Sequence, residues 1–171
     1  CIRDSLYMGR LQWNFLGRDL AWKQTDVEYT DSPTGSFAIA GFTRTGSCTR
    51  WSSSGCGNLD GFAKPLVAAE DQFRIEQAVQ EFAFKYRGFS LQQEWHRKFI
   101  DDRVEGTESA LTGFYIQSGY FFHNLFDAFP APLELAARYA YVNEPNKSVR
   151  SIYNEREEFT LGANWFFAGH S

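Results

Sequence analysis

The sequence predicts an all-β protein, an antiparallel up-and-down sheet of the transmembrane β-barrel type, and three observations lead to this prediction. The segment 159–167 places Phe, Leu, Ala, Trp and Phe at its odd positions and mainly polar residues between them. Apolar residues at every second position describe a strand with one apolar and one polar face, and about seven segments repeat the pattern. The chain also lacks any run of about 18 apolar residues, which excludes a transmembrane helix.

Composition supports one domain and excludes some function classes. The chain has 171 residues, a net charge of −4 and an aromatic share of 18%. The mean hydropathy of −0.41 resembles that of soluble proteins, but strands of a membrane barrel also turn every second residue towards water. No basic cluster is present, so we expect no nucleic-acid partner. No signal peptide is visible, and we expect a processed or partial chain.

The first two expected strands cover residues 5–15 and 35–44. In the first strand, Leu11 and Trp13 share an apolar face, while Arg10 and Gln12 lie on the other. The second strand alternates in the same way. A long link, residues 16–34, joins the two strands.

The third expected strand, residues 72–87, changes phase. Its apolar residues occupy odd-numbered positions at first, such as Phe73 and Ile75, and even-numbered positions later, such as Phe84. Such a switch indicates either a β-bulge or a strand whose first part extends beyond the membrane. Gly88 then makes a tight reversal into a fourth strand that begins at Phe89.

The last three expected strands cover residues 110–122, residues 133–142 and the segment around 159–167. Residues 133–141 also contain good helix formers, and Pro132 could be a first helical residue. We expect a strand there, because the neighbouring segments alternate so regularly.

The connections differ in length. Gly88 and residues 122–132 make short or moderate turns, whereas the cysteine-containing loop, residues 100–106 and residues 143–154 form longer polar loops. Short turns at one end and longer loops at the other are typical of outer-membrane barrels. The link 16–34 is an exception, since it is long and lies on the short-turn side.

Two of the three cysteines lie in a polar stretch rich in Ser and Gly. The short separation of Cys48 and Cys56 predicts a disulfide and an oxidising compartment, with two free thiols as the alternative. A zinc site would need a second pair of ligands, and none with metal-ligand spacing accompanies these two cysteines. Cys1 is either an accident of where the chain begins or a lipoprotein anchor.

Five segments, in order along most of the chain, resemble the phosphate-selective porin O and P family. They are Gly9–Asn14, Phe89–His96, Tyr115–Phe121, Pro132–Tyr139 and Phe159–Trp165, the last followed by Gly169 and His170. The resemblance implies a sixteen-stranded, homotrimeric barrel in the lipid of a bacterial outer membrane. Residues 1–171 would then be a single-domain, partial barrel of about seven strands that lacks the N-terminal half and the last strands. Most of the family's phosphate-selecting basic residues would lie outside it.

The resemblance and the alternation together predict a diffusion porin, a water-filled channel for small, anionic, phosphate-like solutes. Strand parity predicts pore-lining side chains at Arg10, Gln12, Arg44, Lys85, Arg87, Glu94, Lys98, Gln117, Glu134 and Arg138. The opposite parity predicts lipid-facing side chains at Leu11, Trp13, Phe84, Leu91, Trp95, Ile116, Tyr120, Leu135, Leu161 and Trp165. With Glu81 and Glu158, the predicted wall holds six cations and four acids. An excess of cations favours anions; alternatively, the charges only pair across neighbouring strands.

Enzymatic and metal sites have little support in the sequence. The three histidines are scattered, whereas a metal site needs clustered ligands. No Ser–His pair indicates a membrane-barrel esterase, so we expect neither an enzyme nor a cofactor. The main alternative to the porin is a soluble β-barrel or sandwich that binds a small apolar ligand, with its aromatic faces turned inward.

Overall fold

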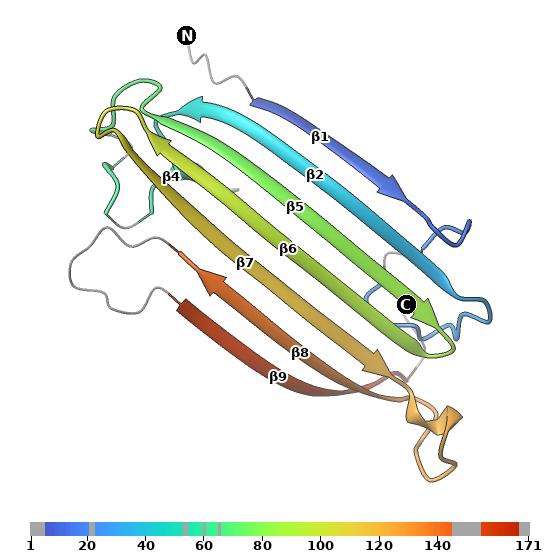
Figure 1. Cartoon of the computed structure of the whole chain (residues 1–171). Coiled ribbons are helices and arrows are strands. Elements are labelled where there is room, and N and C mark those ends of the chain that lie inside the picture. Colours follow the sequence, from blue (N-terminus) through green and yellow to red (C-terminus); the bar gives the residue numbers. More distant parts are fainter. Residues whose placement is uncertain are drawn as a thin grey trace.

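The computed structural model describes residues 6–20, 23–52, 55–59, 61–64, 66–144 and 155–167, and it shows one large bowed antiparallel sheet (Figure 1). The sheet has seven strands in the order β1-β2-β5-β6-β7-β8-β9, each paired with its neighbours along the chain. The strands are β1 (Leu6–Trp13), β2 (Thr34–Gly46), β5 (Phe73–Tyr86), β6 (Phe89–Asp102), β7 (Thr107–Tyr120), β8 (Leu133–Asn143) and β9 (Glu155–Trp165). The predicted all-β, seven-stranded antiparallel sheet is therefore confirmed.

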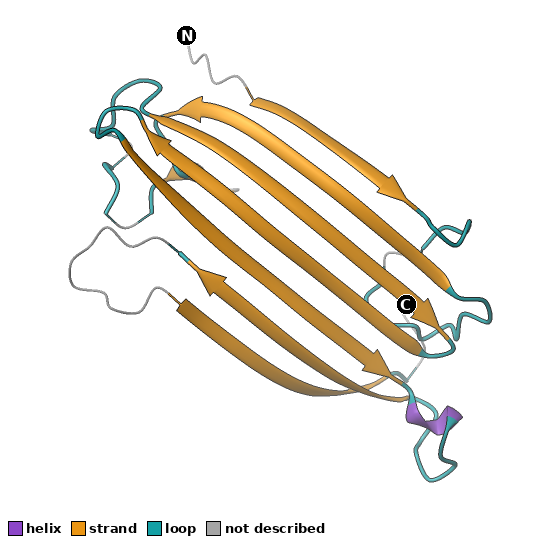
Figure 2. Ribbon diagram, viewed as in Figure 1, coloured by secondary structure: helices purple, strands orange, loops and turns teal. Residues whose placement is uncertain are grey.

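Two small elements lie outside the sheet. A hairpin of β3 (Arg50–Ser52) and β4 (Gly55–Gly57) lies within the cysteine-containing loop. A 3-10 turn, η1 (Phe122–Asn124), follows β7 and is the only helical element in the described part of the chain (Figure 2). No helix of the described residues is both long and apolar enough to span a membrane.

Several strands are longer than the sequence predicted. The expected charged loop 100–106 shrinks to a turn, because β6 continues to Asp102 and β7 begins at Thr107. Gly106 takes a positive φ of 64° there, which suits a residue without a Cβ. Residues 133–143 form a strand paired on both sides, so the alternation outweighs their helix propensity.

The predicted phase change in β5 is not a bulge. The register with β2 and β6 is unbroken from Phe73 to Tyr86. Phe73 and Ile75 are instead buried against Leu59 and Phe62 from the cysteine-containing loop, which folds back over this end of the sheet. The second interpretation, a strand that extends past the apolar band, agrees with this arrangement.

The connections lie at two ends of the sheet. The short-turn end carries the described residues of the link 14–33, the reversal at Gly88 and residues 121–132 (Figure 1). The long-loop end carries the described residues of the connection 47–72, Arg103–Gly106 and Glu144, and residues 145–154 lie outside the described part of the chain. Among the described strands, β1 and β9 are the two edges of the sheet, and all their residues are exposed.

Candidate functional site

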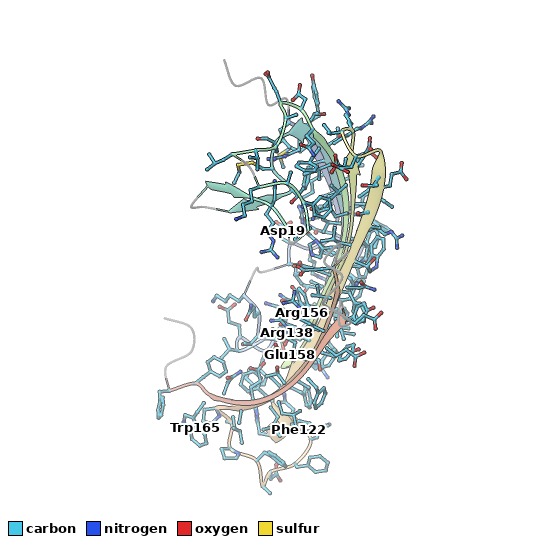
Figure 3. All side chains as sticks on the ribbon, turned by 90° about the vertical axis from the view of Figure 1, so that its left-hand side faces the viewer. Asp19, Phe122, Arg138, Arg156, Glu158 and Trp165 are labelled. Carbon is cyan, nitrogen blue, oxygen red and sulfur yellow. A yellow bond between two sulfur atoms is a disulfide. The ribbon has the colours of Figure 1, made fainter. Side chains whose placement is uncertain are left out.

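The two faces of the sheet differ in chemistry. We call the face that carries the β3–β4 hairpin and the labelled side chains of Asp19 and Arg138 the concave face, and the opposite face the convex face (Figure 3). Because paired residues of neighbouring strands share a face, the register assigns every strand residue to one of the two.

The convex face carries all ten residues that the sequence predicts to be apolar and outward-facing. They are Leu11, Trp13, Phe84, Leu91, Trp95, Ile116, Tyr120, Leu135, Leu161 and Trp165. Leu11 and Leu161 are each 72% exposed, and Trp13 is 67% exposed. Soluble monomers rarely expose contiguous apolar surface on this scale. Among the described residues these side chains do not form a closed core, which the soluble alternative requires.

The concave face carries nine of the ten predicted pore-lining residues. They are Arg10, Gln12, Arg44, Lys85, Glu94, Lys98, Gln117, Glu134 and Arg138. Arg87 is the exception, because β5 ends at Tyr86 and Arg87 lies in the following turn with a φ of 45°. Its guanidinium carbon lies 5.2 Å from the ring centroid of Tyr86, a residue of the convex face. Strand parity could not place Arg87, since parity ends where the strand ends.

A salt bridge spans β2 in the middle of the concave face. Arg10 of β1 contacts Glu81 of β5, with 2.5 Å between Nη2 and Oε2. The strand between them presents Ala38 and Ala40, whose small side chains leave room for the two long ones. This pair agrees with the expectation that wall charges neutralise one another across strands.

A second polar network runs from β6 to β8. The Tyr115 hydroxyl donates a hydrogen bond of 2.8 Å to Glu94 Oε1. The other carboxylate oxygen of Glu94 lies 3.1 Å from His96 Nε2. Arg138 covers the ring of Tyr115, with 4.6 Å between its guanidinium carbon and the ring centroid. A cation above an aromatic face is stabilised by the ring quadrupole, so Tyr115 holds Arg138 in place.

At the long-loop end, two of the predicted cations bind the cysteine-containing loop. Cys48 and Cys56 form the predicted disulfide. Arg44 donates a hydrogen bond of 2.8 Å to the Cys48 carbonyl, and Lys98 donates one to the Thr49 carbonyl. These two side chains therefore anchor the loop to the concave face, a role that strand parity did not indicate.

At the short-turn end, the link between β1 and β2 folds over the concave face. Buried Asp26 accepts hydrogen bonds from the backbone N–H groups of Thr30 and Gly88, the latter at 2.8 Å. Lys85 is only 3% exposed, and it lies beneath a small recess with Asp26 and three charged residues of the link. Those three residues are Asp19, Lys23 and Glu28. The sequence predicted a long link here but not its position.

Tyr29 ties the link to the neighbouring connection. Its hydroxyl lies 2.9 Å from His123 Nδ1 and donates a hydrogen bond of 3.2 Å to the Ala131 carbonyl. Burial, reinforced by the nearby Asp26 carboxylate, raises the pKa of Tyr29 to about 12. The hydroxyl therefore remains protonated and able to donate at neutral pH.

The concave strands are close to neutral overall. Their six cations are Arg10, Arg44, Lys85, Lys98, Arg138 and Arg156, and their five acids are Glu81, Glu94, Asp102, Glu134 and Glu158. The predicted wall included Arg87 and omitted Arg156 and Asp102. Both omitted residues lie at strand ends, where the alternation alone sets no boundary. No group of three or more His, Cys, Asp or Glu residues suits a metal ion in the described ranges, and His170 lies outside them.

Comparison with known proteins gives one match. Residues 49–170 match the family model described as phosphate-selective porin O and P. No curated protein and no solved structure shows a significant match. The matched residues include β3 to β9, and thus five strands of the large sheet.

Proposed function

The chain belongs to the phosphate-selective porin O and P family, whose members are outer-membrane channels and not enzymes. We therefore propose that the sheet is one part of a closed barrel. Its convex face contacts lipid, and its concave face lines a water-filled channel for small anions of the phosphate type. The barrel has sixteen strands and assembles as a homotrimer. The strands that complete it lie outside residues 1–171, which form one partial domain.

The observation that carries this proposal is the separation of the two faces by the register. Exposed Leu and Trp side chains cover one face, and charged and amide side chains cover the other. In lipid, a sheet must close on itself, because unpaired backbone groups at an open edge each cost several kcal/mol. The open edges at β1 and β9 therefore support partner strands beyond those described.

Arg138 is the cation best placed to act on a passing anion. Arg44 and Lys98 bind the cysteine-containing loop, and Lys85 is buried. Arg10 pairs with Glu81, and Arg156 pairs with Glu144. Arg138 instead lies over the ring of Tyr115, which orders it without neutralising its charge. With six cations against five acids on the concave strands, we expect a modest anion preference from this part of the barrel.

The reversal potential of the complete channel tests this proposal. Arg138→Glu, measured in a planar lipid bilayer under a salt gradient, should shift the reversal potential towards the value of a cation-selective channel. The shift should be largest at low salt, because dissolved ions screen the wall charges. Arg87→Glu is the matched control, since it makes the same change of charge in the turn beyond the strand. If Arg138→Glu moves the reversal potential no more than Arg87→Glu, Arg138 does not line the channel.

A further inference from the structure

One cation lies on the convex face close to the long-loop end of the sheet. Arg97 of β6 pairs in register with Ala78 of β5 and Thr112 of β7, and it shares the convex face with Phe99. Its guanidinium carbon lies 5.1 Å from the ring centroid of Phe99, and its Nη1 donates a hydrogen bond of 3.3 Å to Thr112 Oγ1. These two contacts hold the side chain on the face that the proposed function turns towards lipid.

Arg97 has no acidic partner in the described part of the chain. None of the carboxylates described there lies within salt-bridge distance of its guanidinium. Glu76, on the same face of the neighbouring strand, pairs instead with Arg74 at 2.6 Å. Asp101 lies four residues further along β6, which is about 13 Å, and Glu108 is its register partner. Dissolved salt screens exposed charges at that separation, because the Debye length is about 8 Å.

An apolar groove begins beside Arg97. Its volume is about 650 Å³, and its lining on the convex face includes Leu11, Ile39, Ala78 and Trp95. Because Ala78 is the register partner of Arg97, the guanidinium lies next to one end of the groove. On the other side of Arg97, towards the long-loop end, a second recess is lined mainly by charged side chains. Arg97 therefore marks the level at which the convex face changes from apolar to charged, as a barrel wall does where lipid headgroups meet water.

We infer that Arg97 binds the phosphate of an anionic lipid whose acyl chain lies in the groove beside Trp95. An arginine on a lipid-facing surface is costly unless it is paired or reaches the headgroups, and a guanidinium forms paired hydrogen bonds with a phosphate. A groove that is apolar along its length and ends at one cation matches an acyl chain that ends at a phosphate. The inference rests on the proposed function, because it requires the convex face to contact lipid.

Quenching of Trp95 fluorescence by lipids with brominated acyl chains tests this inference. Variants of the complete channel that retain one tryptophan, either Trp95 or Trp165, are refolded in vesicles of zwitterionic phosphatidylcholine and anionic phosphatidylglycerol, with one of the two lipids brominated. Phosphatidylglycerol should bind beside Trp95 about fivefold more tightly than phosphatidylcholine, the ratio expected for one basic side chain at an anionic lipid surface. Trp165, on the convex face at the short-turn end, is the matched control and should show no such preference.

Three substitutions in the Trp95 variant assign the preference to one side chain. Arg97→Gln should abolish the preference for phosphatidylglycerol, and Arg97→Lys should retain part of it, since the charge remains. Arg103→Gln removes a charge from the exposed turn at the same end of the sheet and should leave the preference unchanged.

The possible results separate this inference from the proposed function. Equal quenching of Trp95 by the two lipids, or a preference that survives Arg97→Gln, would overturn the inference alone. Quenching of Trp165 but not of Trp95 would mean that a partner subunit covers the groove, which would also overturn it. Quenching of neither tryptophan would overturn the proposed function, because the convex face would then not contact lipid.

Discussion

The middle of the sheet and its long-loop end have opposite polarity. In the middle, the convex face is apolar, with Trp95 and Ile116, and the concave face carries polar side chains. At the long-loop end, the same convex face carries Arg74, Glu76, Asp101 and Glu108. The concave face there carries a small apolar core instead, because Phe73, Ile75 and Ile100 pack beneath the cysteine-containing loop. Its charged neighbours Arg44 and Lys98 bind that loop.

This reversal shows what the alternation of residues reports. A strand's period of two fixes which residues share a face, but the surroundings of each face decide which one is apolar. In the middle, the convex side is apolar, as expected for contact with lipid, and the concave side is polar, as expected for contact with water. At the long-loop end, a folded loop covers the concave side and excludes water from it, while the convex side carries exposed charges such as Arg74 and Glu76. The continuous strand β5 therefore passes through both environments, and its apolar residues change faces without a bulge.

The largest effect should come from the small core at the long-loop end. Phe73 is fully buried against Phe62 and Ile75, so Phe73→Ala should lower the free energy of unfolding by about 3–5 kcal/mol. Arg74→Ala, the adjacent residue on the other face, should change it by no more than about 0.5 kcal/mol, since its ion pair with Glu76 is half-exposed. Guanidinium titration of the complete barrel refolded in phospholipid vesicles measures both. Equal effects would show that the loop does not cover this end in solution.

A charge on the convex face in mid-sheet should have the next largest effect. Leu161→Arg should cost roughly 2–4 kcal/mol, the penalty for a lipid-facing charge near the bilayer midplane. Thr160→Arg places the same charge on the concave face of the same strand and should cost far less. The same vesicle titration distinguishes the two variants. A tolerated Leu161→Arg would contradict contact with lipid.

The disulfide should contribute the smallest of these effects. Cys48 and Cys56 close a loop with a sequence separation of 8, and removing the bond by Cys48→Ser together with Cys56→Ser should destabilise the folded loop by about 2–3 kcal/mol. We expect this loop to lie on the exterior side of the cell, where the longer loops of outer-membrane barrels are found. Faster proteolysis of the loop in the double variant, with the strands still protected, is the expected result. Thiols that label readily in the unreduced wild-type protein would refute the bond.

Much of the fold could be predicted from the sequence. The alternation located all seven strands, and the register confirms that the ten apolar residues chosen by parity share one face. The phase change at Phe73 was noticed, but two explanations remained open. Only the position of Leu59 and Phe62, which are distant in the sequence, distinguishes them. Contacts between a loop and a sheet depend on where the loop folds, and no local pattern encodes that.

The candidate site could be predicted less completely. Parity placed Lys85, Lys98 and Arg44 on the concave face, but it could not show that the link and the cysteine-containing loop bury or bind them. Parity also gave no sign that the buried carboxylate of Glu134 lies across Gly119 of the neighbouring strand. The long link on the short-turn side was the one available signal, since a connection of that length must cover something or extend into solvent.

The most direct test of the central claim is the environment of consecutive residues in one edge strand. Spin labels placed singly at residues 158 to 163 of β9, in the complete channel in lipid vesicles, report collisions with oxygen, which concentrates in lipid, and with a water-soluble nickel complex. We predict oxygen accessibility at 159, 161 and 163 and nickel accessibility at 158, 160 and 162, in step with the two faces. Uniform accessibility to nickel, or low accessibility to both reagents at the odd positions, would contradict a sheet with lipid on one side and water on the other.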